Sequence, residues 1–478
     1  MDAGKYLPHC NLHEPIRIDE AMQWGDTIQF SVTPDQFSGN GPYCVRIPST
    51  SARWLDLTTM LLYGTLNVKK LVNGLEKDCE EGDDYSMVNF MPNTMWKSVQ
   101  CRIGNTNFED DSTSSYHYKA YFDMLLGDDA SSKRSFLQET SGYYKDSPAD
   151  CRDNASINVL NSAGEAPIIN GKKEDVTLGG DGKPIPLTLS KNENSGYSQR
   201  RELIKESKDF HFVTKTCVDF VQNTNQHFPP GHPPIIFKFI KNDDKFVIIS
   251  NSGVEYVTRL TELKLEVRAI SMHEKITRSV LDAQIGGKPF EMPFLQARCF
   301  SHPIQKHSRS FIQYQVCTGR LPKKLIIGFV RHDAFNGEYK SNPFVFENIG
   351  INSLSFKLNN VSVPATEYRP EFDKTKIGGG NFLREYQHFL NRVGVKRRNI
   401  DYDLSPKDWS TNNCFWVFDA APDLCMDEHR HIENVGCIDI HVSFETATPT
   451  IYNMICHATY SKVGVFPYDG EVAVVDAV

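Results

Sequence analysis

Apolar and polar residues alternate along several stretches of the chain and predict β-strands. Residues 261–270 read TELKLEVRAI and residues 437–445 read CIDIHVSFE, and every second side chain in each is apolar. This period of two predicts strands with one buried and one solvated face. The side chains expected inside are Leu263, Leu265, Val267, Ala269, Ile438, Ile440, Val442 and Phe444. Residues 325–330, LIIGFV, predict a strand that is buried on both faces.

Other stretches predict a hairpin, a long loop and few helices. Residues 234–250 hold two apolar runs around Asn242-Asp243-Asp244, which indicates a hairpin. Residues 116–126 and 381–393 carry apolar side chains at helical spacing. Residues 154–195 are rich in Gly, Asn, Lys and Ser and predict an exposed loop.

A weak internal repeat relates the two halves of the chain. Residues 98–108 read SVQCRIGNTNF and residues 353–363 read SLSFKLNNVSV, with Cys101 matching Phe356. In both places a strand, a tight turn and a polar stretch precede one of the two predicted helices. The repeat indicates duplication of one domain type. Many short strands favour antiparallel sandwiches, the jelly roll among them, but the pattern does not separate a jelly roll from other sandwiches.

Composition agrees with a folded protein of two domains. The chain has 478 residues, and one hydrophobic core rarely serves more than about 250–300 residues. A net charge of −8 gives no general attraction to phosphate backbones. No apolar run approaches the roughly 18 residues of a membrane helix, so we expect no transmembrane segment. The first residues lack the pattern of a secretory signal, and we interpret the 12 cysteines as reduced thiols of an intracellular protein.

Four segments resemble one family of capsid proteins. Residues 196–207 (GYSQRRELIKES), 321–346 (LPKKLIIGFVRHDAFNGEYKSNPFVF), 383–386 (LREY) and 418–424 (FDAAPDL) occur in order. They are similar to segments of the major capsid proteins of Polintons (Mavericks) and adintoviruses, in which a strand precedes D-A-F-N-G and N-P-F-x-F. The Ala-Ala at residues 420–421 departs from the Leu-Thr that is frequent in the family.

The resemblance implies an all-β fold of two tandem antiparallel jelly rolls, with a few short helices in the connecting loops. The repeat and the polar stretch EKITRSVLDAQIGGKP place an N-terminal roll at residues 1–273, a linker at 274–289 and a C-terminal roll at 290–478. The exposed loop, at about 154–195, belongs to the first roll.

The function implied by the resemblance is structural. Homotrimers, pseudo-hexameric in outline, would tile an icosahedral shell around double-stranded DNA in the virion, after assembly inside the host cell. Penton proteins with a single jelly roll and minor capsid proteins would be partners, without sequence-specific contact to nucleic acid. The alternative is a β-sandwich protein that binds or cleaves carbohydrate, which would need paired carboxylates across a cleft.

No motif has the spacing of a catalytic, cofactor or metal site, so we expect none and predict that the protein is not an enzyme. Cys425, His429, His431 and Cys437 come nearest to a zinc site, but C-x3-H-x-H-x5-C is not a usual zinc spacing and favours a polar loop. The chain has no G-x-S-x-G elbow.

The remaining candidates have ordinary structural interpretations. Gly378-Gly379-Gly380 lacks the Lys-Ser/Thr of a phosphate loop. We interpret three acidic pairs as solvated turns: Asp83-Asp84, Asp110-Asp111 and Asp128-Asp129. Asn154 and Asn360 would accept glycans only in a secreted chain.

Two segments leave alternatives open. Lys396-Arg397-Arg398 is a solvated loop, a contact to packaged DNA or a nuclear address. The aromatic residues of 333–346 provide anchors either within a roll or between subunits, and the spacing of Phe344 and Phe346 favours the role within one chain.

Overall fold

The computed structural model consists mostly of antiparallel β-sheets with short helices between the strands. It describes residues 22–32, 37, 41–50, 53–109, 113–146, 168–169, 172–173, 194–222, 226–372, 380–393, 401–419, 435–468 and 471–476. None of the helices in these ranges is long and apolar enough to cross a membrane.

The first half of the chain forms two sheets that face each other across a core. Their strand orders are β1-β13-β3-β10 and β2-β11-β6-β7. We call this sandwich roll 1. Its strands are β1 (Met22–Ser31), β2 (Tyr43–Ile47), β3 (Trp54–Val72), β6 (Trp96–Ile103), β7 (Thr106–Asn107), β10 (Phe210–Lys215), β11 (Ile235–Lys241) and β13 (Glu255–Met272).

The second half forms a corresponding pair of sheets, roll 2. Their strand orders are β14-β23-β16-β21 and β15-β22-β17-β18. The strands are β14 (Phe290–Ile304), β15 (Ser310–Arg320), β16 (Lys324–Arg331), β17 (Ile351–Leu358), β18 (Val361–Tyr368), β21 (Trp416–Asp419), β22 (Val435–Phe444) and β23 (Tyr452–Phe466).

The two rolls have the same topology. If the eight strands of each roll are numbered along the chain, both rolls have the orders 1-8-3-6 and 2-7-4-5. This is the arrangement of a jelly roll. Cys101 lies in β6 and Phe356 in β17, which are the fourth strands of their rolls, so the sequence repeat corresponds to equivalent strands. The expected fold of two tandem jelly rolls is confirmed.

Shorter strands extend or flank these sheets. β4 (Leu75–Asp78) pairs with β3, and β24 (Ala473–Asp476) pairs with β23. Three further pairs stand apart from the main sheets. They are β5 (Ser86–Met87) with β12 (Ile248–Ile249), β8 (Ile168–Ile169) with β9 (Lys172–Lys173), and β19 (Glu371–Phe372) with β20 (Gly380–Asn381).

The helices lie mainly in the connections between strands. They are α1 (Met91–Thr94), α2 (Tyr116–Gly127), α3 (Ala130–Lys133), α4 (Phe136–Ser141), α5 (Ser195–Ile204), α6 (Asp219–Gln222), α7 (Asp244–Val247), α8 (Glu274–Ile285), α9 (His332–Asn336), α10 (Leu383–Val393) and α12 (Pro406–Thr411), with a 3-10 turn at Lys205–Ser207. The two predicted helices correspond to α2 and α10, which hold equivalent places before the sixth strand of each roll.

The strand patterns are confirmed in detail. The eight side chains expected inside are all less than 5% exposed, because they point from β13 and β22 into the cores of roll 1 and roll 2. All residues of 325–330 except Gly328 appear in the apolar core, as expected for a strand buried on both faces. Asp439, expected on the wet side of β22, is only 8% exposed, and its Oδ1 accepts a hydrogen bond of 2.7 Å from the backbone N–H of Gln315.

The hairpin expected at residues 234–250 is wrong. β11 pairs with β2 and β6, whereas β12 pairs with β5. Between them Asp244 starts the short helix α7, and its Oδ1 lies 2.6 Å from Nζ of Lys241. The same Oδ1 accepts a hydrogen bond of 2.9 Å from the backbone N–H of Thr258, so the polar stretch forms a helical turn tied to β11 and β13 instead of a hairpin.

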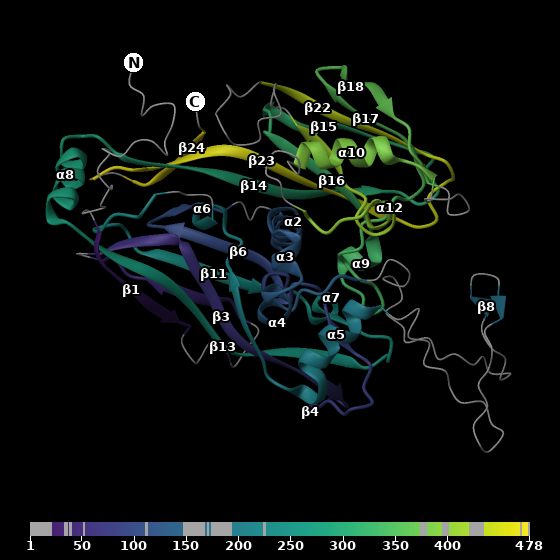
Figure 1. Cartoon of the computed structure of the whole chain (residues 1–478), viewed down its shortest axis with the longest axis horizontal. Coiled ribbons are helices and arrows are strands. Elements are labelled where there is room, and N and C mark those ends of the chain that lie inside the picture. Colours follow the sequence, from purple (N-terminus) through teal and green to yellow (C-terminus); the bar gives the residue numbers. More distant parts are fainter. Residues whose placement is uncertain are drawn as a thin grey trace, which may run out of the picture.

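The two rolls lie side by side, and α8 joins them at one end. Figure 1 shows roll 2 in green and yellow above roll 1 in purple and teal, with α2, α9 and α12 near the seam. The sequence predicted a linker at 274–289 but not the helix within it. None of the twelve residues of α8 is buried. The helix contacts the rolls through side-chain hydrogen bonds such as Trp54 Nε1 to Thr277 Oγ1 at 3.1 Å.

Candidate functional site at the junction of the two rolls

A large buried arrangement of side chains lies where the two rolls meet. Roll 1 contributes α2, which is buried along most of its length. Roll 2 contributes residues 333–346, the D-A-F-N-G and N-P-F-x-F segment, which we call the motif segment. This segment follows β16 and begins within α9.

Aromatic rings join α2 to the motif segment. The pairs, with the distances between ring centroids, are Tyr118 and Phe335 at 5.8 Å, Tyr121 and Phe344 at 4.5 Å, and Phe122 and Phe346 at 5.2 Å. Such offset and tilted pairs add to the free energy gained from burial alone. The aromatic anchors therefore act within one chain, as the sequence favoured, and they join the two rolls. Phe346 also packs within roll 2, where its ring centroid lies 4.7 Å from that of Phe415.

Polar residues of the motif segment fix its path. The side-chain oxygen of Asn342 accepts a hydrogen bond of 3.0 Å from the backbone N–H of Phe344, and its amide donates to Asp146 Oδ2 at 3.1 Å. Gly337 has φ +85°, and a Cβ there would lie 3.0 Å from the backbone nitrogen of Phe246. Only glycine suits this close approach at positive φ. The motif residues thus have structural reasons for their types.

A second apolar cluster lies farther along the same junction. Phe108 of roll 1 packs against Phe220 at 4.6 Å and against Phe466 of roll 2 at 5.6 Å, measured between ring centroids. Phe294 on β14 lies 5.4 Å from Phe220. Rings from β14 and β23 therefore complete a core that belongs to both rolls.

A fully buried group of charged residues adjoins this cluster. Nζ of Lys119, on α2, lies 3.0 Å from Oδ1 of Asp219 and also contacts Oε1 of Glu109. It donates a further hydrogen bond of 2.6 Å to the backbone oxygen of Cys217. Oδ2 of Asp219 accepts a hydrogen bond of 2.7 Å from the backbone N–H of Ala297, on β14 of roll 2.

Burial shifts the pKa values of these groups. Burial raises the pKa values of the Glu109 and Asp219 carboxyls above their ordinary range, because an ionised carboxylate is poorly solvated there. Burial alone would lower the pKa of Lys119, but the carboxylates of Asp219 and Glu109 outweigh it and hold that pKa above its ordinary value.

Further polar contacts bind loops of the two rolls together. Nζ of Lys133 is buried and donates to the backbone oxygen of Tyr402 at 3.0 Å. Nζ of Lys145 lies 2.8 Å from Oδ2 of Asp408. Arg200, fully buried on α5, lies with its Nη2 2.8 Å from Oδ1 of Asp146. Because Asp146 also accepts from the motif segment, this ion pair belongs to the junction.

The candidate metal and basic sites of the sequence fall mostly outside the described residues. Cys425, His429 and His431 lie there, so only Cys437 of the candidate zinc site is placed, on β22. Within the described ranges no three His, Cys, Asp or Glu side chains are grouped to hold a metal ion. Lys396–Arg398, Gly378-Gly379, Asp110-Asp111 and Asn154 also lie outside.

Two of the acidic pairs have structural roles beyond solvation. Asp84 Oδ1 accepts a hydrogen bond of 2.7 Å from the hydroxyl of Tyr197, and Asp83 Oδ2 lies 3.0 Å from Nζ of Lys70. Asp129 caps α3 by accepting from the backbone N–H of Ser132 at 2.8 Å. Asn360 lies in the tight turn between β17 and β18 with φ +68°, as the sequence predicted for a turn.

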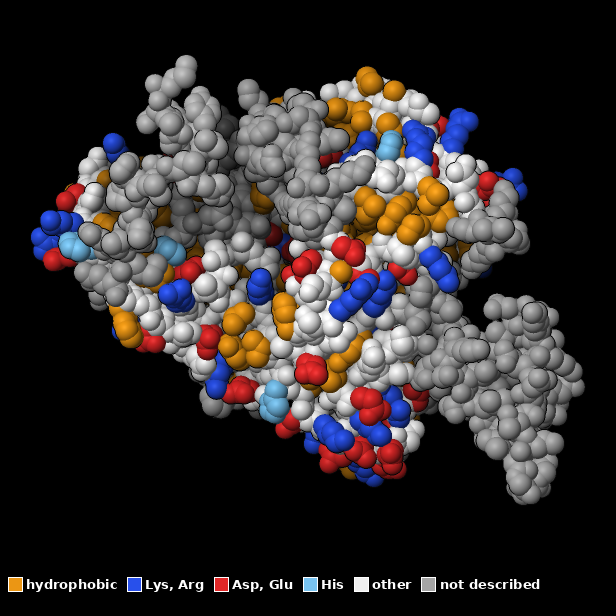
Figure 2. Space-filling view, in the orientation of Figure 1, with side chains coloured by type: hydrophobic (Ala, Val, Ile, Leu, Met, Phe, Trp, Pro, Cys, Tyr) orange, Lys and Arg blue, Asp and Glu red, His pale blue; other side chains and the backbone are white. Residues whose placement is uncertain are grey.

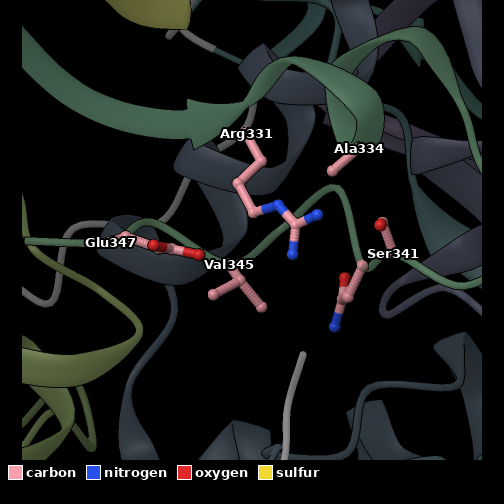
Figure 3. Close-up of a pocket in the computed structure, with 6 residues that line it drawn as sticks. Arg331, Ala334, Ser341, Val345 and Glu347 are labelled. Atoms are coloured by element: carbon pink, nitrogen blue, oxygen red, sulfur yellow. The ribbon is translucent and has the colours of Figure 1, made fainter. Parts of the chain in front are cut away.

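Hollows near the junction are small or open. The recess between Arg331, Ser341 and Val345 has a volume of 10 Å³, about the space of one water molecule. Figure 3 shows the Arg331 side chain extending into it from the strand above. A larger groove of 410 Å³ includes Glu255 and Glu338 in its lining, beside Tyr339.

The groove does not present an exposed aromatic platform for a sugar. The Tyr339 hydroxyl donates to the backbone oxygen of Tyr256 at 3.1 Å, and its ring meets that of Tyr256 edge-on at 6.2 Å. Tyr339 is therefore committed to contacts between the rolls. The groove has two carboxylates in its lining, Glu255 and Glu338, but its aromatic residue, Tyr339, is held by Tyr256.

Sequence reasoning missed the charged group, although one signal was present. Residues 116–126 read YHYKAYFDMLL, in which Lys119 is the only cation among bulky apolar side chains. A helix that is apolar almost all round is buried, so its one lysine must be buried too. The partners of Lys119 lie 10 and 100 residues away, and no local pattern identifies them.

Comparison with known proteins places this architecture in a structural class. No protein-family model matches the chain. An uncharacterized protein of Caenorhabditis elegans is 20% identical over 423 residues, which cover 86% of this chain and 88% of the worm protein.

Solved structures share the fold at very low sequence identity. A chain of the Sputnik virophage superposes with a TM-score of 0.59 and 10% identity, over 98% of this chain and 92% of that chain. The Faustovirus major capsid protein gives 0.53 and 8%, over 95% and 93%. The mavirus major capsid protein gives 0.50 and 11%, over 98% and 92%. The chain therefore has the double jelly-roll fold of viral major capsid proteins.

Proposed function

We propose that this chain is a major capsid protein that assembles as a homotrimer and tiles an icosahedral shell around double-stranded DNA. The observation that carries the proposal is the pair of equivalent jelly rolls held side by side by a buried junction. One chain thereby contributes two similar but non-identical flanks, so a head-to-tail contact can close into a ring. Three copies would supply six rolls, a pseudo-hexagonal unit.

The motif segment supports a more specific lineage. Two of the segments that resemble the capsid proteins of Polintons and adintoviruses contribute to the junction: the motif segment, and residues 196–207 through Arg200. We therefore propose that the chain belongs to that branch of double jelly-roll proteins and divides at residues 273 and 290, with α8 between the domains. A single jelly-roll penton protein and minor capsid proteins would be its partners, and the virion its location.

Surface charge supports a structural role without sequence-specific binding of nucleic acid. Figure 2 shows Lys and Arg side chains interspersed with Asp and Glu on this face, without a broad basic patch. The net charge of −8 agrees with that view. We propose no catalytic activity.

Mass measurement and imaging test the proposal. Light scattering on the purified chain at low micromolar concentration should give the mass of a trimer, and negative-stain micrographs should show pseudo-hexagonal particles or shells. An obligate trimer buries large interfaces, often above about 2,000 Å², so it should survive dilution. A stable monomer at that concentration would contradict the proposal, and cleavage of oligosaccharides by that monomer would support the carbohydrate alternative.

A further inference from the structure

Lys119, Glu109 and Asp219 form a group with the components of an amide-forming site. All three side chains are fully buried, with exposures of 3%, 1% and 4%. Lys119 Nζ faces both carboxyls and lies 3.0 Å from Asp219 Oδ1, while a third carboxylate, that of the partly exposed Asp123, lies farther away at 3.9 Å. The shorter distance is to the oxygen bonded to Cγ of Asp219, the atom that the nitrogen must reach, and groups held so close in a fixed orientation gain a large rate advantage over the same groups free in solution.

The surroundings exclude bulk water from the group. Phe108, Tyr116 and Phe220 are buried next to these residues in sequence, and Nζ of Lys119 lies 5.6 Å from the centroid of the Tyr116 ring. The carboxylates keep the pKa of Lys119 above its ordinary value, so the resting lysine is an ammonium. Because charges are costly in such surroundings, transfer of its proton to a neighbouring carboxylate within the group leaves both partners neutral. Loss of a proton is the change that makes the lysine nitrogen a nucleophile.

We propose that Lys119 and Asp219 join through an isopeptide bond, with Glu109 transferring the protons. The inference concerns the fold of roll 1 and is independent of the proposed capsid function. It requires no oxidant and no cofactor, because an ammonium and a carboxylate condense to an amide and one water molecule.

The atoms of the group have distinct roles in this reaction. Glu109 accepts a proton from Lys119 Nζ, which its Oε1 contacts, and burial raises the pKa of this carboxyl and so favours its protonated form. Glu109 then passes the proton to Asp219 Oδ1. The lone pair of Nζ attacks Cγ of Asp219, and the C–N bond forms.

Oδ1 of Asp219 becomes the leaving group, and Oδ2 carries the developing charge. A second proton moves from Nζ through Glu109 to Oδ1, the Cγ–Oδ1 bond breaks, and Oδ1 leaves as water. Oδ2 carries the negative charge in the tetrahedral intermediate and becomes the amide oxygen. The backbone N–H of Ala297 already donates to Oδ2 at 2.7 Å, where it stabilises that charge. Glu109 returns to its initial state.

The choice of Asp219 over Glu109 as the linked carboxyl rests on these contacts. Asp219 has the donor from roll 2 on the oxygen that must become an oxyanion. Glu109 lies between the reacting residues, with Oε1 against Nζ of Lys119 and Oε2 accepting the backbone N–H of Asp219 at 3.0 Å, and is therefore placed to transfer protons. The donor is on β14, so the reaction site is complete only when roll 2 has docked against roll 1.

Intact mass decides the matter without any variant. The purified full-length chain, denatured and measured by mass spectrometry, should be lighter than its sequence mass by one water. Digestion should then yield a branched peptide that contains Lys119 joined to Asp219. A mass equal to that of the sequence would overturn the proposal, as would a branch between Lys119 and Glu109.

Variants separate the three roles. Lys119→Met, Asp219→Ala and Glu109→Gln should each have the full mass of their sequences. The matched control is Lys241→Met, because Lys241 is also buried against a carboxylate, that of Asp244, at 2.6 Å. This control should keep the loss of water. Loss of water in Glu109→Gln would overturn the role of Glu109, and absence of the loss in Lys241→Met would overturn the assignment to Lys119.

Discussion

Replacing Phe344 with alanine tests whether the junction fuses the two rolls into one folding unit. Phe344 is 3% exposed and lies between α2 and α7, with its ring stacked on Tyr121 at 4.5 Å. It also meets the rings of Tyr118 at 5.8 Å and Phe246 at 5.9 Å. The substitution removes the ring, and the methyl group of alanine leaves most of its space empty.

The expected cost follows from burial and from the lost ring contacts. Truncating a buried phenylalanine to alanine lowers the free energy of unfolding by about 3–5 kcal/mol. Each lost aromatic pair adds about 0.5–1.5 kcal/mol beyond burial, partly counted in that range already. We therefore expect Phe344→Ala to lose roughly 3–5 kcal/mol, a large share of the stability typical of a domain.

Urea denaturation followed by tryptophan fluorescence measures this loss. The control is Phe136→Ala, because Phe136 on α4 is 55% exposed and its loss should change stability by less than about 0.5 kcal/mol. A single transition in the native chain should become two in Phe344→Ala, as the rolls unfold separately.

Two results would refute this reasoning. A loss below about 1 kcal/mol would show that the aromatic layer does not hold the rolls together. A loss that grows with dilution would place Phe344 between subunits, since a contact within one chain is independent of protein concentration.

Three further predictions concern the backbone at Gly337, the protonation of His117 and the loop of residues 150–190. Gly337→Ala should lose about 1–3 kcal/mol in the same assay, and more than Gly253→Ala, whose φ of +71° is similar but whose Cβ would meet no atom within 4 Å. Burial lowers the pKa of His117 to about 3. Between pH 6.5 and 3 this imidazole is therefore protonated in the unfolded chain and neutral in the folded chain. Stability should fall by roughly 1.4 kcal/mol per pH unit there, and a His117→Leu variant with an equally steep fall in its denaturation midpoint would contradict this cause. Replacing residues 150–190 with a short Gly-Ser linker should leave the melting temperature nearly unchanged, because Asn194 Nδ2 donates to Asp146 Oδ1 at 2.9 Å and keeps the ends of the segment together. Extending the deletion through Asn194 should cost about 1 kcal/mol more, because Asn194 caps α5, and equal stability of the two deletions would refute that role.

Local patterns predicted the individual strands well, for a physical reason. In β13 and β22 the two faces of each strand see opposite environments, so alternation is imposed on every residue. In β16 both faces are covered, so residues 325–330 are apolar without alternation. The sequence repeat correctly indicated two similar domains, because equivalent strands of the two rolls pair with equivalent neighbours.

Long-range pairing was beyond these patterns. Residues 234–250 look like a hairpin because two apolar runs flank a polar turn, yet the partner of β12 is β5, about 160 residues earlier. The core shared by Phe108 and Phe466 joins positions more than 350 residues apart. The charged group was missed for the same reason, since Lys119, Asp219 and Ala297 come together only when both rolls are folded and docked.

The exposed helix α8 has a consequence for how such a chain could have arisen. It provides the covalent connection between β13 and β14, yet none of its residues is buried, whereas the contacts that hold the rolls together lie in the junction. Two separate polypeptides ending and beginning within α8 should therefore still find each other and form the same double jelly-roll fold when expressed together. An ancestral pair of single-roll proteins, encoded by adjacent copies of one gene, would have needed only a short in-frame fusion to become one chain with fixed stoichiometry.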